Sequence, residues 1–268
     1  EEQVKICGGK PVTVTTKAEN GYKMTAKELE SAITDKTVAI IINSPCNPTG
    51  AVYSKEELLS IAAVCEKHGL MIISDEIYEK LIYDDNTHVS IAALSDYAFN
   101  NTVVINGVSK TYAMTGWRIG YLAAPKQLAA VISRVQGHTT SNATSFCQYA
   151  ALTALNGGSE IVDMMRDSFD KRRKLMLKLA GELGLNAIKP EGAFYMFLDI
   201  KPFIGKSIDG KKITGSMSFA DLLIDGGVAV IPGLPFKEDG FVRLSYAVSE
   251  ADITEGFKRI GEFIKKIK

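Results

Sequence analysis

Two short, largely apolar runs flank an amphipathic segment in the first third of the chain, and this order constrains the fold strongly. The runs are residues 38–42 (VAIII) and 70–74 (LMIIS). Continuous apolar runs of this length are typical of strands with both faces covered. The segment between them begins with Ser54, has Glu57 three residues later and ends before Gly69, which predicts a helix with a capping box and a glycine C-cap. Strand, helix and strand in this order predict an α/β sheet with helices on both faces.

Polar side chains follow these strands at the points where each strand ends. Asp75 comes directly after the second run, and residues 103–105 form a third β-branched run before a loop that holds Ser109, Lys110 and Arg118. Open α/β sheets bind ligands at the carboxyl ends of their strands. A lysine there can act as a nucleophile, and an arginine fork with a hydroxyl suits a phosphate. From these residues alone, a solvated loop lysine and a helix-capping aspartate remain the simpler interpretation.

Four sequence blocks in a fixed order carry a resemblance to a known family. They are residues 43–50 (NSPCNPTG), 74–78 (SDEIY), 109–120 (SKTYAMTGWRIG) and 242–247 (VRLSYA). Together they resemble the fold-type I enzymes that use pyridoxal phosphate (PLP), and most closely the class I/II aminotransferases of the aspartate aminotransferase family. The resemblance covers the whole chain. It implies the PLP-dependent transferase fold type I, a mostly parallel sheet with helices on both faces, followed by an α+β small domain.

The same resemblance implies roles around the cofactor ring. Lys110 would bind PLP covalently and later move the proton of the substrate α-carbon. Asp75 would pair with the pyridine nitrogen and keep it protonated, which makes the ring an electron sink. Tyr78 would donate to the ring oxygen, and the amide of Asn47 would bond the ring hydroxyl oxygen. The alternative for Asn47 is a simple turn before a helix.

Further roles concern the phosphate and the substrate. The resemblance implies that Ser109 and Arg118 bind the phosphate, whereas Gly107 stands where family members often carry another hydroxyl. One phosphate contact is therefore expected to be missing or supplied by another group. Arg243 lies in an apolar strand, where an unpaired arginine is costly to bury. The resemblance implies that it holds the substrate α-carboxylate bidentately, and a surface salt bridge is the alternative.

The other periodic segments predict the remaining elements. The expected helices are residues 25–33, 126–136, 144–155, 159–183, 218–225 and 249–266, and the expected strands are residues 118–124, 193–198, 228–231 and 241–245. We predict a large PLP-binding domain at residues 1–160 and a C-terminal small domain at residues 161–268. Residues 1–16 are expected to be a strand-bearing connection, and His88 is expected at the surface. Because the start of the chain resembles the middle of the large domain, we expect the N-terminal part of that domain to be absent here.

Composition narrows the possible partners. Lys and Arg number 31 and Asp and Glu number 31, so the formal net charge is zero and nothing favours nucleic acid or a membrane surface. No apolar run approaches the length of a transmembrane helix. The four cysteines lack CxxC spacing and the three histidines are scattered, so we predict no metal site. Four unpatterned cysteines suit a reducing compartment, and we predict a cytoplasmic location. The resemblance also implies that the protein forms a homodimer.

The predicted function is the ping-pong transfer of an amino group between an amino acid and a 2-oxo acid. One alternative is another fold-type I PLP enzyme, a carbon–sulfur lyase or a decarboxylase, because Lys110, Asp75 and Arg118 would serve these as well. Two others are an aminotransferase-like sensor domain of a transcription regulator and an inactive fragment. Residues 136–138 (QGH) hold no arginine where one branch of the family reads a dicarboxylate.

Overall fold

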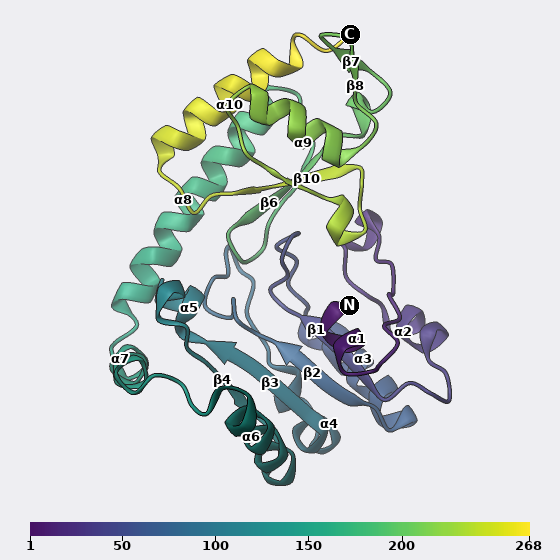
Figure 1. The fold of residues 1–268 in the computed structure, drawn as a ribbon, viewed down its shortest axis with the longest axis vertical. Helices are drawn as coiled ribbons and strands as arrows, with labels where there is room; N and C mark the ends of the chain where they lie inside the picture. Colours follow the sequence, from purple (N-terminus) through teal and green to yellow (C-terminus); the bar gives the residue numbers. More distant parts are fainter.

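The computed structural model describes residues 1–268 and places them around two separate sheets (Figure 1). The first sheet has the order β1-β2-β3-β4. Its strands are β1 (Ala39–Asn43), β2 (Met71–Asp75), β3 (Thr102–Gly107) and β4 (Gly120–Ala123). The first three strands run parallel, and β4 pairs with β3 in the antiparallel sense. The predicted mostly parallel sheet is confirmed.

The helix between β1 and β2 shows why this part of the sequence folds as it does. Helix α3 (Lys55–His68) has the expected capping box, in which Ser54 accepts from the Glu57 N–H and the Glu57 carboxylate accepts from the Ser54 N–H. Gly69 ends the helix in the left-handed conformation, with φ +64°. On the face towards the sheet, Ile61 is fully buried. Burial of such a side chain stabilises the fold by about 1.5–3 kcal/mol.

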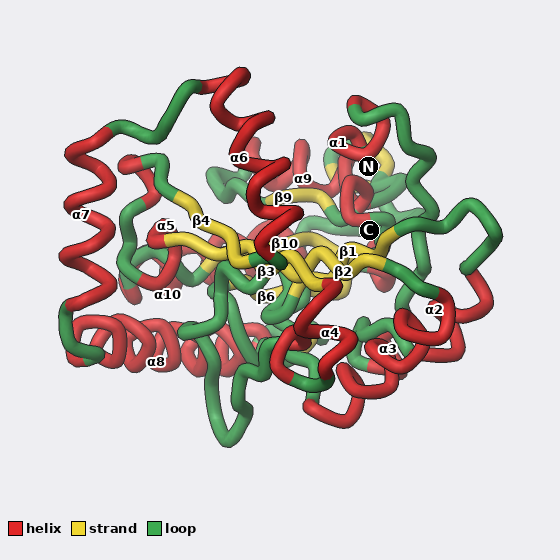
Figure 2. The backbone as a smooth tube through the Cα atoms, turned by 90° about the horizontal axis from the view of Figure 1, so that it is seen from below, coloured by secondary structure: helices red, strands yellow, loops and turns green.

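The helices around the first sheet form two groups (Figure 2). Helices α2 (Ala26–Ala32), α3 and α4 (Asp96–Asn101) lie together and share a core of buried side chains with β1 and β2. Helices α6 (Lys126–Thr140) and α7 (Ser145–Asn156) lie apart from them. No residue of α6 is buried, and only Cys147 and Ala151 of α7 are.

The second sheet is antiparallel and lies in the upper half of Figure 1. Its strands, in order of pairing, are β5 (Ala187–Ile188), β6 (Tyr195–Asp199), β10 (Phe241–Ser245) and β9 (Ile231–Pro232). The helices beside it are α8 (Glu160–Glu182), α9 (Ser216–Asp225) and α10 (Glu250–Ile264), and a small hairpin joins β7 (Ser207–Ile208) to β8 (Lys211–Lys212). The core of this half contains 20 buried residues. The long helix α8 extends from the region of the first sheet to the second, and a domain boundary at residue 160 stays a prediction.

The expected strand near the start of the chain is wrong. Residues 2–6 form the short helix α1 (Glu2–Ile6), and no strand precedes β1. No residue of α1 is buried. No neighbouring strand is there for these residues to pair with. The backbone therefore bonds within the segment, as in the 3.0 Å bond from the Lys5 N–H to the Glu1 carbonyl.

Gly50 lies where the loop after β1 meets the second half of the molecule. Its φ is +73°, and an added Cβ would lie 2.6 Å from Pro190 Cβ and 2.8 Å from the Gly192 carbonyl oxygen. We expect Gly50→Ala to lower the free energy of unfolding by about 1–3 kcal/mol through overpacking, in addition to about 1–2 kcal/mol for the left-handed backbone. Denaturant unfolding measures this change.

Gly69→Ala is the matched control for that substitution. Gly69 has a similar φ of +64°, but no atom lies within 4 Å of its added Cβ. Gly69→Ala should therefore lower the free energy of unfolding only by the backbone cost of about 1–2 kcal/mol. Equal losses of stability in the two variants would contradict the close packing of Gly50.

Candidate active site

The parallel strands bring polar side chains to one edge of the first sheet. In the strand register Asn43 lies beside Asp75, and Asp75 lies beside Ile105. The carboxyl ends of β1, β2 and β3 therefore meet, as expected for a ligand site in such a sheet. The short helix α5 (Val108–Thr111) follows β3 directly and carries Lys110.

The amine of Lys110 lies against two aromatic rings. Its Nζ is 5.9 Å from the centre of the Tyr78 ring and 5.5 Å from that of Phe194. The Tyr78 and Tyr195 hydroxyls share a hydrogen bond of 3.1 Å. Burial, with a further contribution from Tyr195, raises the pKa of Tyr78 well above its usual range. The Tyr78 hydroxyl therefore keeps its proton at neutral pH and can donate it in a hydrogen bond.

Asp75 is a half-buried carboxylate that lacks a cation. Its Oδ1 accepts from the Ile77 N–H at 3.1 Å. Burial raises the pKa of Asp75, the Ile77 N–H lowers it, and the neighbouring charge of Glu76 raises it further. A cationic group placed beside this carboxylate would offset the cost of its burial.

Arg243 reaches the site from strand β10 of the second sheet. Its Nη1 donates to Asn47 Oδ1 at 2.7 Å, and its guanidinium lies 4.3 Å from the centre of the Tyr195 ring and 5.3 Å from that of Phe236. Its Nε is buried and has no hydrogen-bond partner. A buried donor without a partner is costly, and a carboxylate matches the fork geometry of a guanidinium. The alternative for Arg243, a surface salt bridge, is therefore not what surrounds it.

Asn47 connects the two sheets at this site. Its backbone N–H donates to Asn43 Oδ1 at 3.0 Å, and the Asn43 side chain donates to the Asp75 carbonyl at 3.0 Å. Its own side chain accepts from Arg243. Asn43 and Asn47 thus link the end of β1, the end of β2 and β10, which a simple turn would not do.

Ser109 and Arg118 differ in their placement. Ser109 precedes Lys110 in α5 and is half-buried. Arg118 is exposed, and its Nη1 donates to the Thr115 carbonyl at 2.6 Å. At Gly107 an added Cβ would lie 3.0 Å from the Ile119 carbonyl oxygen, so a larger residue there would need a small shift of this neighbouring backbone.

A second polar cluster lies beside the site, and the sequence analysis missed it. Glu76 is buried, and its Oε1 accepts from the hydroxyls of Ser74 and Ser90 at 2.8 Å each. His88 Nε2 lies 2.9 Å from Glu76 Oε2, and the His88 side chain is 12% exposed, so its expected surface position is wrong. Glu76, Glu79 and His88 also offer ligand atoms within 4.8 Å of one another. Glu76 follows directly after β2, and His88 and Ser90 come from the loop beyond it, so no local pattern in the sequence indicated that they meet.

Phe194 and Tyr195 are two further aromatic residues at the site. In the structure Tyr195 contacts both Tyr78 and Arg243, and Phe194 lies beside Lys110.

Comparisons with known proteins show similarity over nearly the whole chain. A sequence model of the family described as "Aminotransferase class I and II" matches residues 1–260. The aspartate aminotransferase of Bacillus subtilis is 46% identical over 266 residues, which make up 99% of this chain and 67% of that protein. A probable aspartate/prephenate aminotransferase of Aquifex aeolicus is 42% identical over 270 residues, with the same shares covered.

The solved structures lead to the same group. The crystal structure of the aspartate aminotransferase from Rhizobium meliloti superimposes with a TM-score of 0.95 at 39% identity, over 99% of this chain and 67% of that one. The chain thus spans about two thirds of the length of these relatives.

Proposed function

Because this chain belongs to the class I and II aminotransferases, which use PLP to move an amino group between an amino acid and a 2-oxo acid, we propose that Lys110 and its neighbours carry out this reaction. The observation that carries the proposal is the position of Tyr195. Its hydroxyl bonds Tyr78 beside Lys110, and its ring lies against Arg243 with the unpaired Nε. One side chain thus connects a nucleophilic amine with a donor that fits a carboxylate.

The side chains present fit PLP. Asp75 has a raised pKa and would gain from the protonated pyridine nitrogen of PLP, which supplies the missing cation. The Tyr78 hydroxyl and the Asn47 amide offer donors for the ring oxygen. Ser109 would bind the phosphate beside Lys110, and Arg118 would exchange its bond to the Thr115 carbonyl for a phosphate oxygen.

Each of these residues has a defined chemical task. When bound, PLP supplies an electron-withdrawing ring that stabilises negative charge on the substrate α-carbon. Asp75 holds the proton at the pyridine nitrogen and so maintains that effect. The Lys110 amine would take the proton from the substrate α-carbon and give it to the cofactor carbon, which is general base and then general acid catalysis by one group. Tyr78, whose hydroxyl stays protonated, orients the ring oxygen by donating to it.

The substrate carboxylate is assigned to Arg243, whose guanidinium Asn47 holds in place. We propose aspartate as the amino donor because the relatives named above are aspartate aminotransferases. Residues 136–138 offer no arginine for a second carboxylate. The site as described therefore accounts for the α-carboxylate, and the preference for aspartate rests on the relatives.

The reaction itself is tested by mixing the protein with PLP and L-aspartate and recording absorption and products. We expect the visible absorption of the bound cofactor to fall, one equivalent of oxaloacetate to form, and 2-oxoglutarate to restore the absorption. Carbon dioxide or ammonia as the product would contradict amino transfer and support a decarboxylase or a lyase.

Arg243→Ala should mainly raise KM for the amino acid. Loss of a buried charge pair costs about 2–5 kcal/mol, which is about 30-fold or more in KM. Steady-state kinetics with aspartate measures this change. Arg259→Ala is the matched control, because Arg259 pairs with Glu255 on the exposed face of α10. An unchanged KM in Arg243→Ala would contradict the assignment.

We also propose that the protein is a homodimer. The support is an exposed apolar face on α6 and α7. Its residues are Val131, Val135, Phe146, Tyr149 and Leu152, of which Tyr149 is 73% exposed. Apolar patches of this kind mark protein interfaces.

Sedimentation equilibrium tests the dimer. We expect twice the chain mass of 29.1 kDa, and we expect Tyr149→Glu to produce monomers. Phe99→Glu is the control, because Phe99 is 70% exposed and belongs to α4 rather than to α6 or α7. A wild-type protein that sediments as a monomer would refute the homodimer.

A cytoplasmic location is the last part of the proposal. All four cysteines are free thiols, as is usual in a reducing compartment. No helix is both long and apolar enough to cross a membrane. Fractionation of the producing cells would test the location, and recovery with secreted protein would contradict it.

A further inference from the structure

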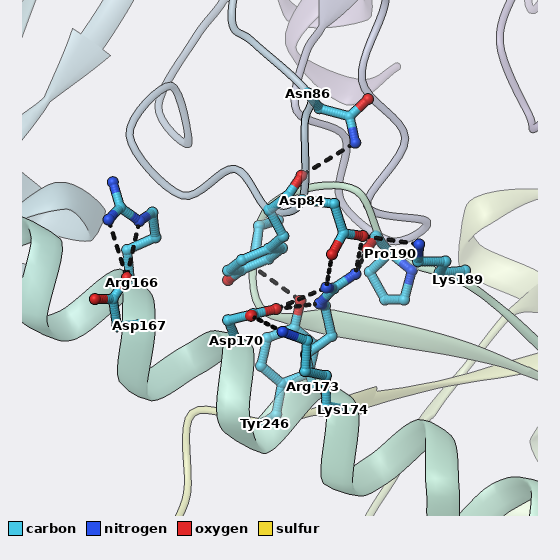
Figure 3. Close-up of polar contacts among 12 residues, drawn as sticks. Asp84, Asn86, Arg166, Asp167, Asp170, Arg173, Lys174, Lys189, Pro190 and Tyr246 are labelled. Atoms are coloured by element: carbon cyan, nitrogen blue, oxygen red, sulfur yellow. Dashed lines mark hydrogen bonds and ion pairs between the residues drawn. The ribbon is translucent and has the colours of Figure 1, made fainter.

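Arg173 is a buried arginine on α8 that ties three distant parts of the chain together (Figure 3). Its side chain is 1% exposed. Its Nη1 and Nη2 donate to the two carboxylate oxygens of Asp84 at 3.0 and 2.7 Å, and its Nε donates to Asp170 at 2.8 Å. Nη1 also donates to the Pro190 carbonyl at 2.8 Å. The guanidinium lies 4.9 Å from the centre of the Tyr83 ring. The N–H groups of Arg173 thus bond three different residues at once.

Pro190 begins a segment, residues 190–195, that is held against the first half of the molecule. Two successive N–H groups of this segment donate to the Gly50 carbonyl at 3.0 and 2.8 Å, and a third donates to the Leu81 carbonyl at 2.9 Å. The Tyr83 hydroxyl donates to the Ala193 carbonyl. Ala193 itself has φ +59°, a conformation that a non-glycine residue keeps only where its surroundings impose it.

Segment 190–195 ends in the two aromatic residues of the site. Phe194 lies 5.5 Å from Lys110 Nζ, and Tyr195 contacts Tyr78 and Arg243. A shift of this segment would therefore move the surroundings of the amine and of the carboxylate-binding arginine together. Misplacement of such groups by 1 Å can cost a large part of a reaction rate.

We propose that Arg173 is a positioning residue for amino transfer, which holds segment 190–195 where Phe194 and Tyr195 meet Lys110 and Arg243. This inference rests on the proposed function. Arginine is suited to the task because its planar fork bonds both Asp84 oxygens while other N–H groups reach Asp170 and Pro190. Lysine has no such fork. Loss of the guanidinium would leave the Asp84 and Asp170 carboxylates and the Pro190 carbonyl without their shared donor.

Arg173→Met, Arg173→Lys and the control Arg166→Met test the proposal. Arg166 also lies on α8 and pairs with Asp163 and Asp167, but its side chain is 37% exposed and it touches no part of segment 190–195. Three experiments compare these proteins. The first measures the exchange rates of the amide hydrogens of segment 190–195 without cofactor, and the second the dissociation constant of maleate, an unreactive dicarboxylate, with PLP bound. The third measures KM and kcat for aspartate.

We expect both Arg173 variants to raise KM and the maleate dissociation constant at least tenfold and to speed amide exchange in segment 190–195. Arg166→Met should match the wild type. A merely structural role would lower the amount of folded protein but leave KM and the dissociation constant of the folded molecules unchanged. That outcome overturns the proposal, and so does unchanged amide exchange.

Asp84→Asn keeps the test decisive where Arg173→Met does not fold. It retains the side-chain size and leaves the bonds of Arg173 to Asp170 and Pro190 in place. We expect Asp84→Asn to raise KM and the maleate dissociation constant and to speed amide exchange, as the Arg173 variants do. If all three stay at the wild-type values, the proposal is refuted. A wild-type protein that does not transfer amino groups would refute the proposed function and this inference with it. An active wild type with unchanged variants would refute this inference alone.

Discussion

Lys110→Ala is expected to abolish covalent attachment of PLP and to lower kcat by about 10²–10⁴. The reason is that one amine serves as both the attachment point and the group that moves the substrate proton. In the structure it lies beside the rings of Tyr78 and Phe194, and a methyl group at this position can do neither task. Borohydride reduction followed by mass spectrometry of the peptides measures the attachment, and steady-state kinetics measures kcat.

Lys80→Ala is the control for this substitution. Lys80 is exposed, and its amine lies 3.9 Å from Glu79. It should keep both the reducible cofactor and the activity. A Lys110→Ala protein that still traps PLP after borohydride would show that another amine holds the cofactor.

Asp75→Asn is expected to change activity and stability in opposite directions. Turnover should fall by about 10²–10³, because an amide cannot hold the proton at the pyridine nitrogen as a carboxylate does. The melting temperature of the cofactor-free protein at pH 7 should rise. Burial raises the pKa of Asp75 in the folded state, so the folded protein binds this proton more tightly than the unfolded chain.

The sign of the stability change follows from that difference. The stability that comes from a protonated Asp75 is complete below its unfolded pKa of about 3.9 and is lost as pH rises through the folded pKa. At pH 7 the ionised carboxylate therefore destabilises the cofactor-free fold, and asparagine removes that cost. Asp85→Asn makes the same change of charge at an exposed position and should leave the melting temperature nearly unchanged. A lower melting temperature in Asp75→Asn would show that Asp75 has a stabilising partner.

Local signals in the sequence predicted much of the fold. The capping box at Ser54 and Glu57 set the start of α3, and the apolar run at residues 241–245 coincides with β10. These elements depend on contacts within a few residues, which propensity and periodicity describe well. The resemblance to the aminotransferases then supplied the family and the cofactor, and the comparisons confirm both.

The parts that the sequence did not predict depend on contacts between distant segments. Nothing near Arg173 in the sequence indicates that Asp84 and Pro190 share its guanidinium, and nothing near His88 indicates its contact with Glu76. The expected strand at the start of the chain failed because no neighbouring strand is there to pair with it, and residues 2–6 form helix α1 instead. The roles assigned to the site residues stay predictions until the variants are measured.

The bond between Asn47 and Arg243 also bears on how the protein is made. The two residues are 196 positions apart, and a ribosome that adds about 5–20 residues per second needs roughly 10–40 s to cover that distance. Lys110 leaves the ribosome well before β10 is complete. A nascent chain can therefore expose its reactive amine while the arginine assigned to the substrate carboxylate is still unsynthesised. The growing polypeptide thus gains its reactive amine before it can recognise the amino acid.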